Sequence, residues 1–308
     1  MRTITIIVLT ALSLSSCFTG IESTPRITES DVKRSATAQL PADDSSLAEI
    51  KPQHLQDWQP GKAFYVTNPK IGLALTLSPA GSTLHEADTL HYRSVTEVTS
   101  IMGRPVAQIL FDGPRGITAI YRADVSVDRL SSLDGVNIPF TVELSVPQTA
   151  RRLMKGHEYW ITTSEWLDTR RQPRRGRKFV PVRVIDVVEG DDTYPVCLML
   201  EDYTRQPADT FAIMMSVGDG IASSRRFQTM FALTDPHTRY PAITDATWAH
   251  IINGRVAEGM THEEVRLSVG RPVNIDRRPG YGSLREIWTY ENGTFLIFED
   301  GLLKNLSL

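Results

Sequence analysis

Residues 259–272 read Gly-Met-Thr-His-Glu-Glu-Val-Arg-Leu-Ser-Val-Gly-Arg-Pro, and this stretch predicts a helix together with both of its ends. Thr261 is placed as the N-cap, and Glu264 three residues later completes a capping box, in which each side chain accepts a hydrogen bond from the other residue's backbone amide. Gly270 supplies the left-handed residue after the last turn, and Pro272 prevents the helix from continuing. The sequence therefore predicts a helix between Thr261 and Gly270.

A second helix is predicted just before this one. Residues 244–253 place Trp248 and other apolar residues on one helical face, and Gly254 ends the segment. Met260 and Val265 then occupy the two positions of a hydrophobic staple, which fixes how the chain enters the later helix. We expect the two helices to follow one another with a short turn between them.

Three short strands are predicted after the helices. They are residues 286–290, 294–298 and 302–306. Asn292-Gly293 and Asp300-Gly301 are dipeptides typical of tight hairpin turns. The helices must then cover one face of this antiparallel sheet, because neither layer buries its apolar side alone.

These residues together carry a resemblance to a known family. The motif runs through Gly254, Gly259, Met260, Thr261, Glu264, Val265, Gly270, Pro272, Trp288 and Tyr290. In this pattern, residues 243–308 resemble the SmpA/OmlA (BamE-like) lipoprotein domain. The resemblance implies a two-layer ααβββ domain in an envelope lipoprotein that acts by binding. The best-known members of the family serve the machine that assembles outer-membrane barrels.

The middle of the chain is predicted to be a duplicated β unit. The alternation of Ile71, Leu73, Leu75 and Leu77 with small or polar residues predicts a half-buried strand, and the continuous apolar runs 106–111 and 196–200 predict central strands. Three pairs of landmarks correspond at offsets of 95, 89 and 92 residues: Phe64 and Tyr159, Phe111 and Leu200, and Ser131 and Ser223. We expect two small antiparallel barrels or sandwiches, residues 57–147 and 148–238. The predicted class of the whole chain is α+β, mostly β.

The first residues predict export and lipidation. Residues 1–16 have the charge and short apolar stretch of a secretory signal. They end in Leu-Ser-Ser before Cys17, which resembles a bacterial lipobox. Acylation of Cys17 would attach the protein to a membrane by two or three chains. Residues 17–56, rich in polar residues and proline, are expected to form a flexible tether, and the whole chain resembles outer-membrane lipoproteins of the Bacteroidetes.

One loop is strongly basic. Residues 170–178 carry six cations: Arg170, Arg171, Arg174, Arg175, Arg177 and Lys178. They fit a site for phosphate-bearing headgroups or an acidic partner. They equally fit a solvated hairpin tip.

Composition limits the classes of function. The 308 residues carry a net charge of −3 and two cysteines, which argues against nucleic-acid binding and against cysteine-rich metal sites. No nucleophile elbow, phosphate loop or zinc-protease motif is present. We therefore expect no catalysis, cofactor or metal, and we expect Cys197 to be a buried free thiol.

The predicted function is a membrane-anchored scaffold on either face of the outer membrane. It would bind an envelope protein, with a role in outer-membrane assembly or integrity. The alternative is a tethered glycan-binding module or enzyme built on the β units. Its candidate aromatic face comprises Trp58, Tyr65, Tyr159, Trp160 and Trp166. Core packing is the other use of such residues.

Overall fold

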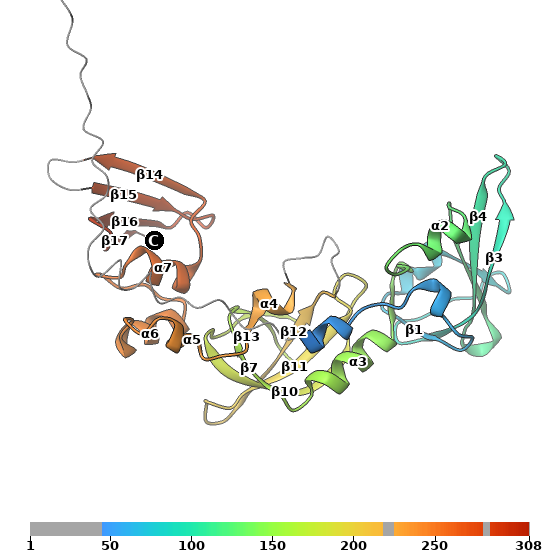
Figure 1. The fold of residues 1–308 in the computed structure, drawn as a ribbon, viewed down its shortest axis with the longest axis horizontal. Coiled ribbons are helices and arrows are strands. Elements are labelled where there is room, and N and C mark those ends of the chain that lie inside the picture. The colour runs from blue at the N-terminus through green and yellow to red at the C-terminus, as the bar shows by residue number, and fades with distance from the viewer. Residues whose placement is uncertain (1–44, 218–224, 280–283, 308) are drawn as a thin grey trace, which may run out of the picture.

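The computed structural model describes residues 45–217, 225–279 and 284–307, which form three units in a row (Figure 1). Each unit has its own antiparallel sheet and its own apolar core. Strands outnumber helices in every unit, and the predicted α+β, mostly β class is confirmed.

The first unit contains a curled six-stranded sheet in the order β2-β5-β4-β3-β1-β6. Its strands are β1 (Ala63–Val66), β2 (Leu75–Ser78), β3 (Thr89–Thr99), β4 (Pro105–Asp112), β5 (Thr118–Ala123) and β6 (Thr141–Glu143). The helical turns are η2 (Leu55–Asp57), η3 (Pro69–Leu73), η4 (Pro114–Gly116) and α2 (Val127–Ser131). The predicted alternating strand around residue 71 is wrong in its first half, because Pro69 at the start of η3 and the Asn68 cap favour a helical turn there.

The second unit contains a seven-stranded sheet in the order β13-β7-β10-β11-β12-β8-β9. Its strands are β7 (Glu158–Ile161), β8 (Glu165–Leu167), β9 (Pro173–Arg175), β10 (Val180–Glu189), β11 (Val196–Asp202), β12 (Asp209–Met215) and β13 (Phe231–Ala232). Its helices are α3 (Ser145–Met154), α4 (Phe227–Met230) and α5 (Pro236–Arg239). β11 lies in the middle of the sheet and is almost completely buried, as its continuous apolar run predicts.

The two sheets repeat one arrangement. The sheet order in the first unit, β6-β1-β3-β4-β5-β2, corresponds strand for strand to β13-β7-β10-β11-β12-β8 in the second. Corresponding strands also follow one another in the same order along the chain. A short helix precedes the last strand of both, α2 in one and α4 in the other. Even the irregularities agree, because β3 and β10 each shift register, after Tyr92 and after Val184. The amide of Gly61 donates to Tyr92, and that of Gly156 to Val184, at 2.7 and 2.8 Å.

The boundary between these units lies a few residues before the predicted one. Residues 141–143 complete the first sheet, whereas α3 begins at Ser145 and packs on β10 and β11 of the second. Pro147 marks the predicted end of the first unit. It instead occupies the first turn of α3, where a missing N–H costs nothing because that position has no intrahelical acceptor.

The last part of the predicted tether is structured. Residues 45–58, which we call the linking segment, include η1 (Ser45–Glu49) and η2. Leu47 and Ile50 are buried in the core of the second unit, whereas Leu55 and Trp58 are buried in that of the first. The segment has too few apolar residues for a core of its own, but these side chains complete the cores of two neighbouring units.

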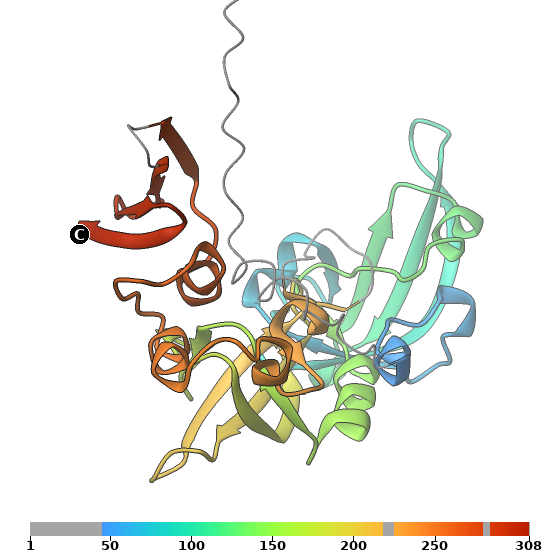
Figure 2. The same cartoon turned by 60° about the vertical axis from the view of Figure 1, so that its left-hand side comes forward.

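The third unit has two layers, as predicted (Figure 2). Helices α6 (Asp245–Ile252) and α7 (His262–Val269) pack beside a four-stranded sheet in the order β14-β15-β16-β17. Strands β14 (Asn274–Pro279), β15 (Leu284–Thr289), β16 (Phe295–Glu299) and β17 (Leu302–Ser307) pair antiparallel. The predicted ααβββ order is therefore wrong, because it lacks the first strand of the sheet, β14. The sequence of β14, Asn-Ile-Asp-Arg-Arg-Pro, has no apolar pattern from which a strand could be predicted. As an edge strand with exposed polar side chains, it is held by its backbone pairing to β15.

Candidate functional site

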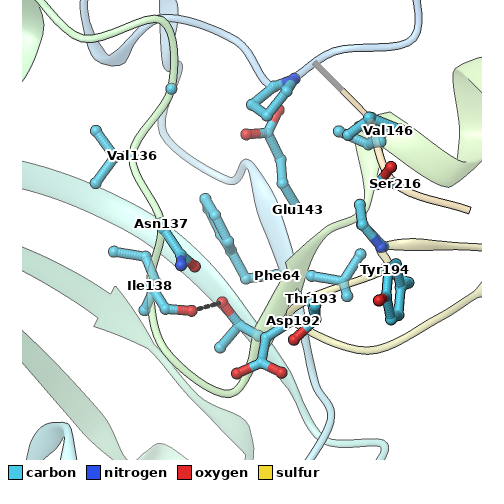
Figure 3. Close-up of a pocket in the computed structure, with 16 residues that line it drawn as sticks. Phe64, Val136, Asn137, Ile138, Glu143, Val146, Asp192, Thr193, Tyr194 and Ser216 are labelled. Atoms are coloured by element: carbon cyan, nitrogen blue, oxygen red, sulfur yellow. Dashed lines mark hydrogen bonds between the residues drawn. The ribbon is translucent and has the colours of Figure 1, made fainter. Parts of the chain in front are cut away.

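A cavity of about 730 Å³ lies where the first two units meet (Figure 3). The first unit contributes residues 135–138 and strand β6, and the second contributes residues 192–195 with Ser216 and Val217. Pro52 of the linking segment closes part of the wall. Most lining side chains are apolar, so the few polar atoms that reach the cavity determine which groups it can hold.

Glu143 is the buried charged group of this cavity. Its side chain is 6% exposed, and Oε1 lies 2.6 Å from Nζ of Lys62, which is 7% exposed. The Ser145 hydroxyl donates to the same oxygen at 2.5 Å, and the Gln53 amide donates at 3.1 Å. Lys62 also donates to Oε1 of Gln53. These four residues form an internally neutral cluster that ties the linking segment to the end of β6.

Two buried polar atoms of the cavity are left without partners among the residues that the structure describes. One is Oε2 of Glu143, the second oxygen of the carboxylate, and the other is Oγ of Ser216. A buried polar atom without a partner costs about 1–3 kcal/mol. Both residues line the same cavity.

The opposite wall is held by a tight turn between β10 and β11. Oδ1 of Asp191 accepts hydrogen bonds from the amides of Thr193 and Tyr194, and this fixes the turn. Oδ2 of Asp192 then accepts from the Phe140 amide of the first unit at 3.2 Å. This bond connects the two units at the rim of the cavity, where Figure 3 shows Asp192.

The polar groups in and beside the cavity are better suited to binding a molecule than to catalysis. Lys62 donates to three acceptors, on Gln53, Glu143 and Ser145, which uses all three N–H groups of an ammonium and leaves no lone pair for proton abstraction. Neither Ser145 nor Lys62 is among the described residues that line the cavity, so neither side chain is presented to a molecule held there. The free oxygen of Glu143 can accept a hydrogen bond from an N–H or O–H group, while the apolar walls exclude water around it.

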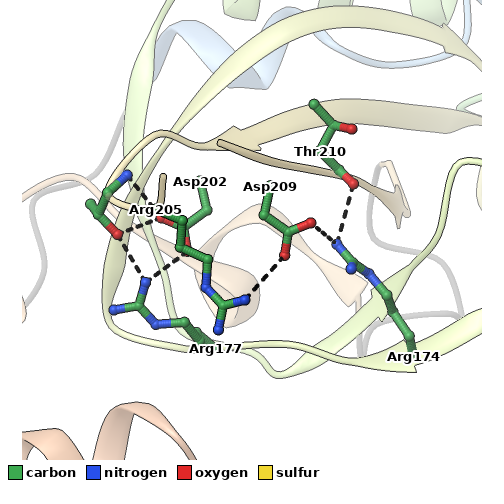
Figure 4. A network of polar contacts seen from close by, with 7 residues as sticks. Arg174, Arg177, Asp202, Arg205, Asp209 and Thr210 are labelled. Carbon is green, nitrogen blue, oxygen red and sulfur yellow. Dashed lines mark hydrogen bonds and ion pairs between the residues drawn. The ribbon is translucent and has the colours of Figure 1, made fainter. Parts of the chain in front are cut away.

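The basic loop is mostly tied to the second unit (Figure 4). It is a hairpin of β8 and β9, as predicted, but Arg174 lies 2.8 Å from Asp209 and also donates to the Thr210 carbonyl. Arg177 lies 3.0 Å from the fully buried Asp202. Arg174 and Arg177 are therefore paired within the second unit, and neither the predicted site for an anionic partner nor a solvated hairpin tip describes these two residues.

The other cations of the loop differ in their surroundings. Burial, with a smaller contribution from Arg175, lowers the pKa of the Lys178 ammonium to about 8. Arg171 donates to the Glu189 carbonyl, and Arg175 lies beside Gly254 of the third unit. Arg170 is exposed. These cations therefore have different surroundings: Arg171 contacts the second unit, Arg175 lies beside the third unit, and Arg170 is exposed.

The motif residues of the third unit hold its fold. Thr261 and Glu264 form the predicted capping box, and Val265 is fully buried. Trp288 is also fully buried, and its indole N–H donates to Glu286 at 3.0 Å. The three motif glycines, Gly254, Gly259 and Gly270, all adopt positive φ. Met260 is buried, and Pro272 follows the end of the helix. The Tyr290 hydroxyl donates to the Gly270 carbonyl.

Glu286 and its neighbours form a polar cluster within the core of the third unit. Burial alone would raise the pKa of the Glu286 carboxyl, but the Trp288 hydrogen bond, His262 and Arg277 together lower it. The His262 ring stacks on Trp288 with centroids 4.9 Å apart. His262 thus belongs to a packed cluster, and the described residues contain no group of three His, Cys, Asp or Glu side chains suited to a metal.

The remaining candidate residues have other locations. Trp58, Tyr159 and Trp166 are buried in the two β cores, whereas Tyr65 and Trp160 are half-buried. Cys197 is a buried free thiol, as predicted, and burial raises its pKa. The signal 1–16 and Cys17 lie outside the described residues. Every helix in the described part of the chain is too short or too polar to cross a bilayer.

Comparison with models of known families, with curated proteins and with solved structures found no match. The function therefore has to be argued from the site. Sequence reasoning missed Lys62, Glu143 and Ser216, which come from distant segments and follow no local motif. The one available signal was a charged residue, Glu143, placed within a strand between apolar neighbours.

Proposed function

We propose that this protein is a lipid-anchored envelope protein that acts by binding, without catalysis, and that the cavity between its first two units receives part of a partner protein. The observation that carries the proposal is the pair of unsatisfied buried atoms, Oε2 of Glu143 and Oγ of Ser216, in one cavity. An extended peptide offers N–H and C=O groups to such atoms and apolar side chains to the walls. Strand β6 lies at an edge of its sheet beside the cavity, a position suited to an extended segment.

The anchor is proposed from the first residues. A signal at 1–16, small residues before Cys17 and the thiol itself are what lipoprotein processing needs. The acylated chain would stay on the outer membrane, because two or three acyl chains hold far more firmly than one. The linking segment, packed into both β units, would then be the first structured part after the tether.

Two further relationships belong to this proposal. The identical strand order and matching register shifts of the first two units support an origin by duplication. The capping box, the positive-φ glycines and the buried tryptophan support a BamE-like third unit, although its sheet has a fourth strand. A role in outer-membrane assembly or integrity follows from that likeness.

The alternative function, a glycan-binding module or an enzyme on a tether, has less support. A glycan platform needs exposed aromatic faces, whereas Trp58, Tyr159 and Trp166 pack inside the cores. An enzyme needs an available nucleophile or base in the cavity, whereas Ser145 and Lys62 are engaged with Glu143.

Site-specific photocrosslinking in intact cells tests the proposed function. A photoreactive phenylalanine analogue would replace Asn137, which is exposed and lines the cavity, or Leu73, which is 84% exposed elsewhere on the same unit. We expect an envelope protein to be captured from position 137 and not from position 73. We also expect Ser216→Ala to reduce that capture, because the variant removes one of the two unsatisfied atoms.

Two results would contradict the proposal. Equal capture from both positions would show that the cavity has no special role. Capture from position 137 that is insensitive to Ser216→Ala would place the contact at the rim only. A glycan in place of a protein on the crosslinked residue would favour the alternative function.

A further inference from the structure

The hairpin that joins β3 and β4 has an apolar apex. Ile101 and Met102 occupy its turn and are 108% and 85% exposed, the highest and second highest values among the described large apolar residues. Val98 on the adjoining strand is 36% exposed. In both views of the fold the hairpin extends beyond the rest of the first unit (Figures 1 and 2). We call residues 98–106 the hairpin apex.

Three backbone amides of this apex are hydrogen-bonded within the turn. The Ser100 amide donates to the Arg104 carbonyl at 2.8 Å, and the Gly103 amide donates to the Ser100 carbonyl at 2.9 Å. The Arg104 amide donates to the Ser100 hydroxyl at 3.0 Å. Unpaired backbone groups are what usually exclude a turn from an apolar medium. Here the turn presents two large apolar side chains, while three of its amides are already bonded.

The surroundings of the apex are those of a lipid–water boundary. Arg104 and Arg122 lie beside it together with Asp124, and Glu97 precedes it on β3, so cations and acids next to the apex balance. Long arginine side chains can keep their charged ends at headgroup level while the apolar residues lie deeper. Adjacent, fully exposed isoleucine and methionine side chains are uncommon on a soluble surface unless something receives them.

We infer that the hairpin apex inserts Ile101 and Met102 into the bilayer that holds the anchor. The hairpin projects beyond the rest of the first unit (Figures 1 and 2), so its apex can reach a planar surface before other parts of that unit do. The inference rests on the proposed anchor: Cys17 and Ser45 are separated by 27 residues (18–44), enough for about 90 Å of extended chain. That length lets the first unit turn its apex towards the membrane. Insertion there would orient the three units relative to the bilayer and hold the cavity at a fixed distance from it.

An environment-sensitive dye tests this inference on the complete lipidated protein. Met102→Cys would be labelled with nitrobenzoxadiazole, which reacts at this position alone because Cys17 is acylated in that protein and Cys197 is buried. Leu73→Cys, exposed on another part of the same unit, is the matched control. Both proteins would be reconstituted into vesicles of phosphatidylethanolamine and phosphatidylglycerol.

We expect the dye at position 102 to shift its emission to shorter wavelength and to be quenched by brominated acyl chains, and the dye at position 73 to do neither. Ile101→Ser in the labelled protein should cause a loss of most of the shift. Anchored protein whose dye at 102 stays in water would overturn the inference and leave the anchor standing. A shift that also occurs in detergent-free buffer without vesicles would overturn it too, since protein would then cover the apex. Protein that does not remain on the vesicles overturns both the inference and the proposed anchor.

Discussion

Replacing Arg177 by methionine removes one partner of an ion pair whose other partner, Asp202, is fully buried. The Nη1–Oδ2 distance is 3.0 Å, and the remaining donors to Asp202 are the amide and hydroxyl of Thr204 (Figure 4). The variant tests whether the basic loop is part of the second unit or a free cationic surface.

The size of the effect follows from burial. Breaking a buried ion pair by removing one partner costs about 3–5 kcal/mol. The Arg177 side chain is 22% exposed, so water reaches part of the site and the cost lies at the lower end. We expect a loss of about 3 kcal/mol, which corresponds to about a hundredfold in an equilibrium constant.

Hydrogen exchange in the native state is the suitable assay, because three separate cores need not unfold together. The amides of β11 and β12 should lose about a hundredfold in protection in Arg177→Met. Arg170→Met, at an exposed position of the same loop, should change protection by less than about threefold. The double variant Arg177→Met with Asp202→Asn should recover part of the loss, since no buried charge is then stranded. Equal protection in Arg177→Met and Arg170→Met would refute the reasoning.

Three further predictions concern single side chains. The pKa of Lys178 is lowered to about 8 in the folded state, so the unfolded chain binds the proton more tightly. The free energy of unfolding should therefore rise with pH between about 8 and 10.5. Lys178→Met should abolish that rise in denaturation measured as a function of pH. The lowered pKa of Glu286 implies stabilisation that is present above about pH 4.5 and is lost as the pH falls through the folded-state value, so Glu286→Gln should flatten the acid limb of the same curve. A methyl group on Gly176 would lie 1.9 Å from the Trp166 ring, and Gly176→Ala should lower stability by about 3 kcal/mol in calorimetry, whereas an unchanged melting temperature would show that the ring moves freely.

The sequence was informative where local rules agree. The helix α7 has its capping box and its glycine end at the predicted residues, because those interactions join neighbours in the chain. The central strands β4 and β11 were predictable from their apolar runs. Of the landmark pairs, Phe64 with Tyr159 and Phe111 with Leu200 lie on corresponding strands of the two units, whereas Ser223 lies outside the described residues.

Features that depend on tertiary pairing were not predictable. Strand β14 is polar and forms because β15 offers it an edge. The linking segment is polar on average, yet four of its apolar side chains fill cores formed by other residues. The basic loop looked free because Asp202 and Asp209, which pair with it, lie some 25–35 residues away in the chain. The cavity was missed for the same reason, since Glu143 and Ser216 belong to different units.

We propose that a lipid at Cys17 keeps this protein on a membrane. Intact-mass and N-terminal peptide mass spectrometry of the protein extracted from membranes tests it most directly. The account predicts a mature chain that begins at Cys17 and carries diacylglycerol on its sulfur, and a Cys17→Ser chain that leaves the membrane fraction. A chain that starts at another residue, or an unmodified Cys17 in protein still found with membranes, would contradict it.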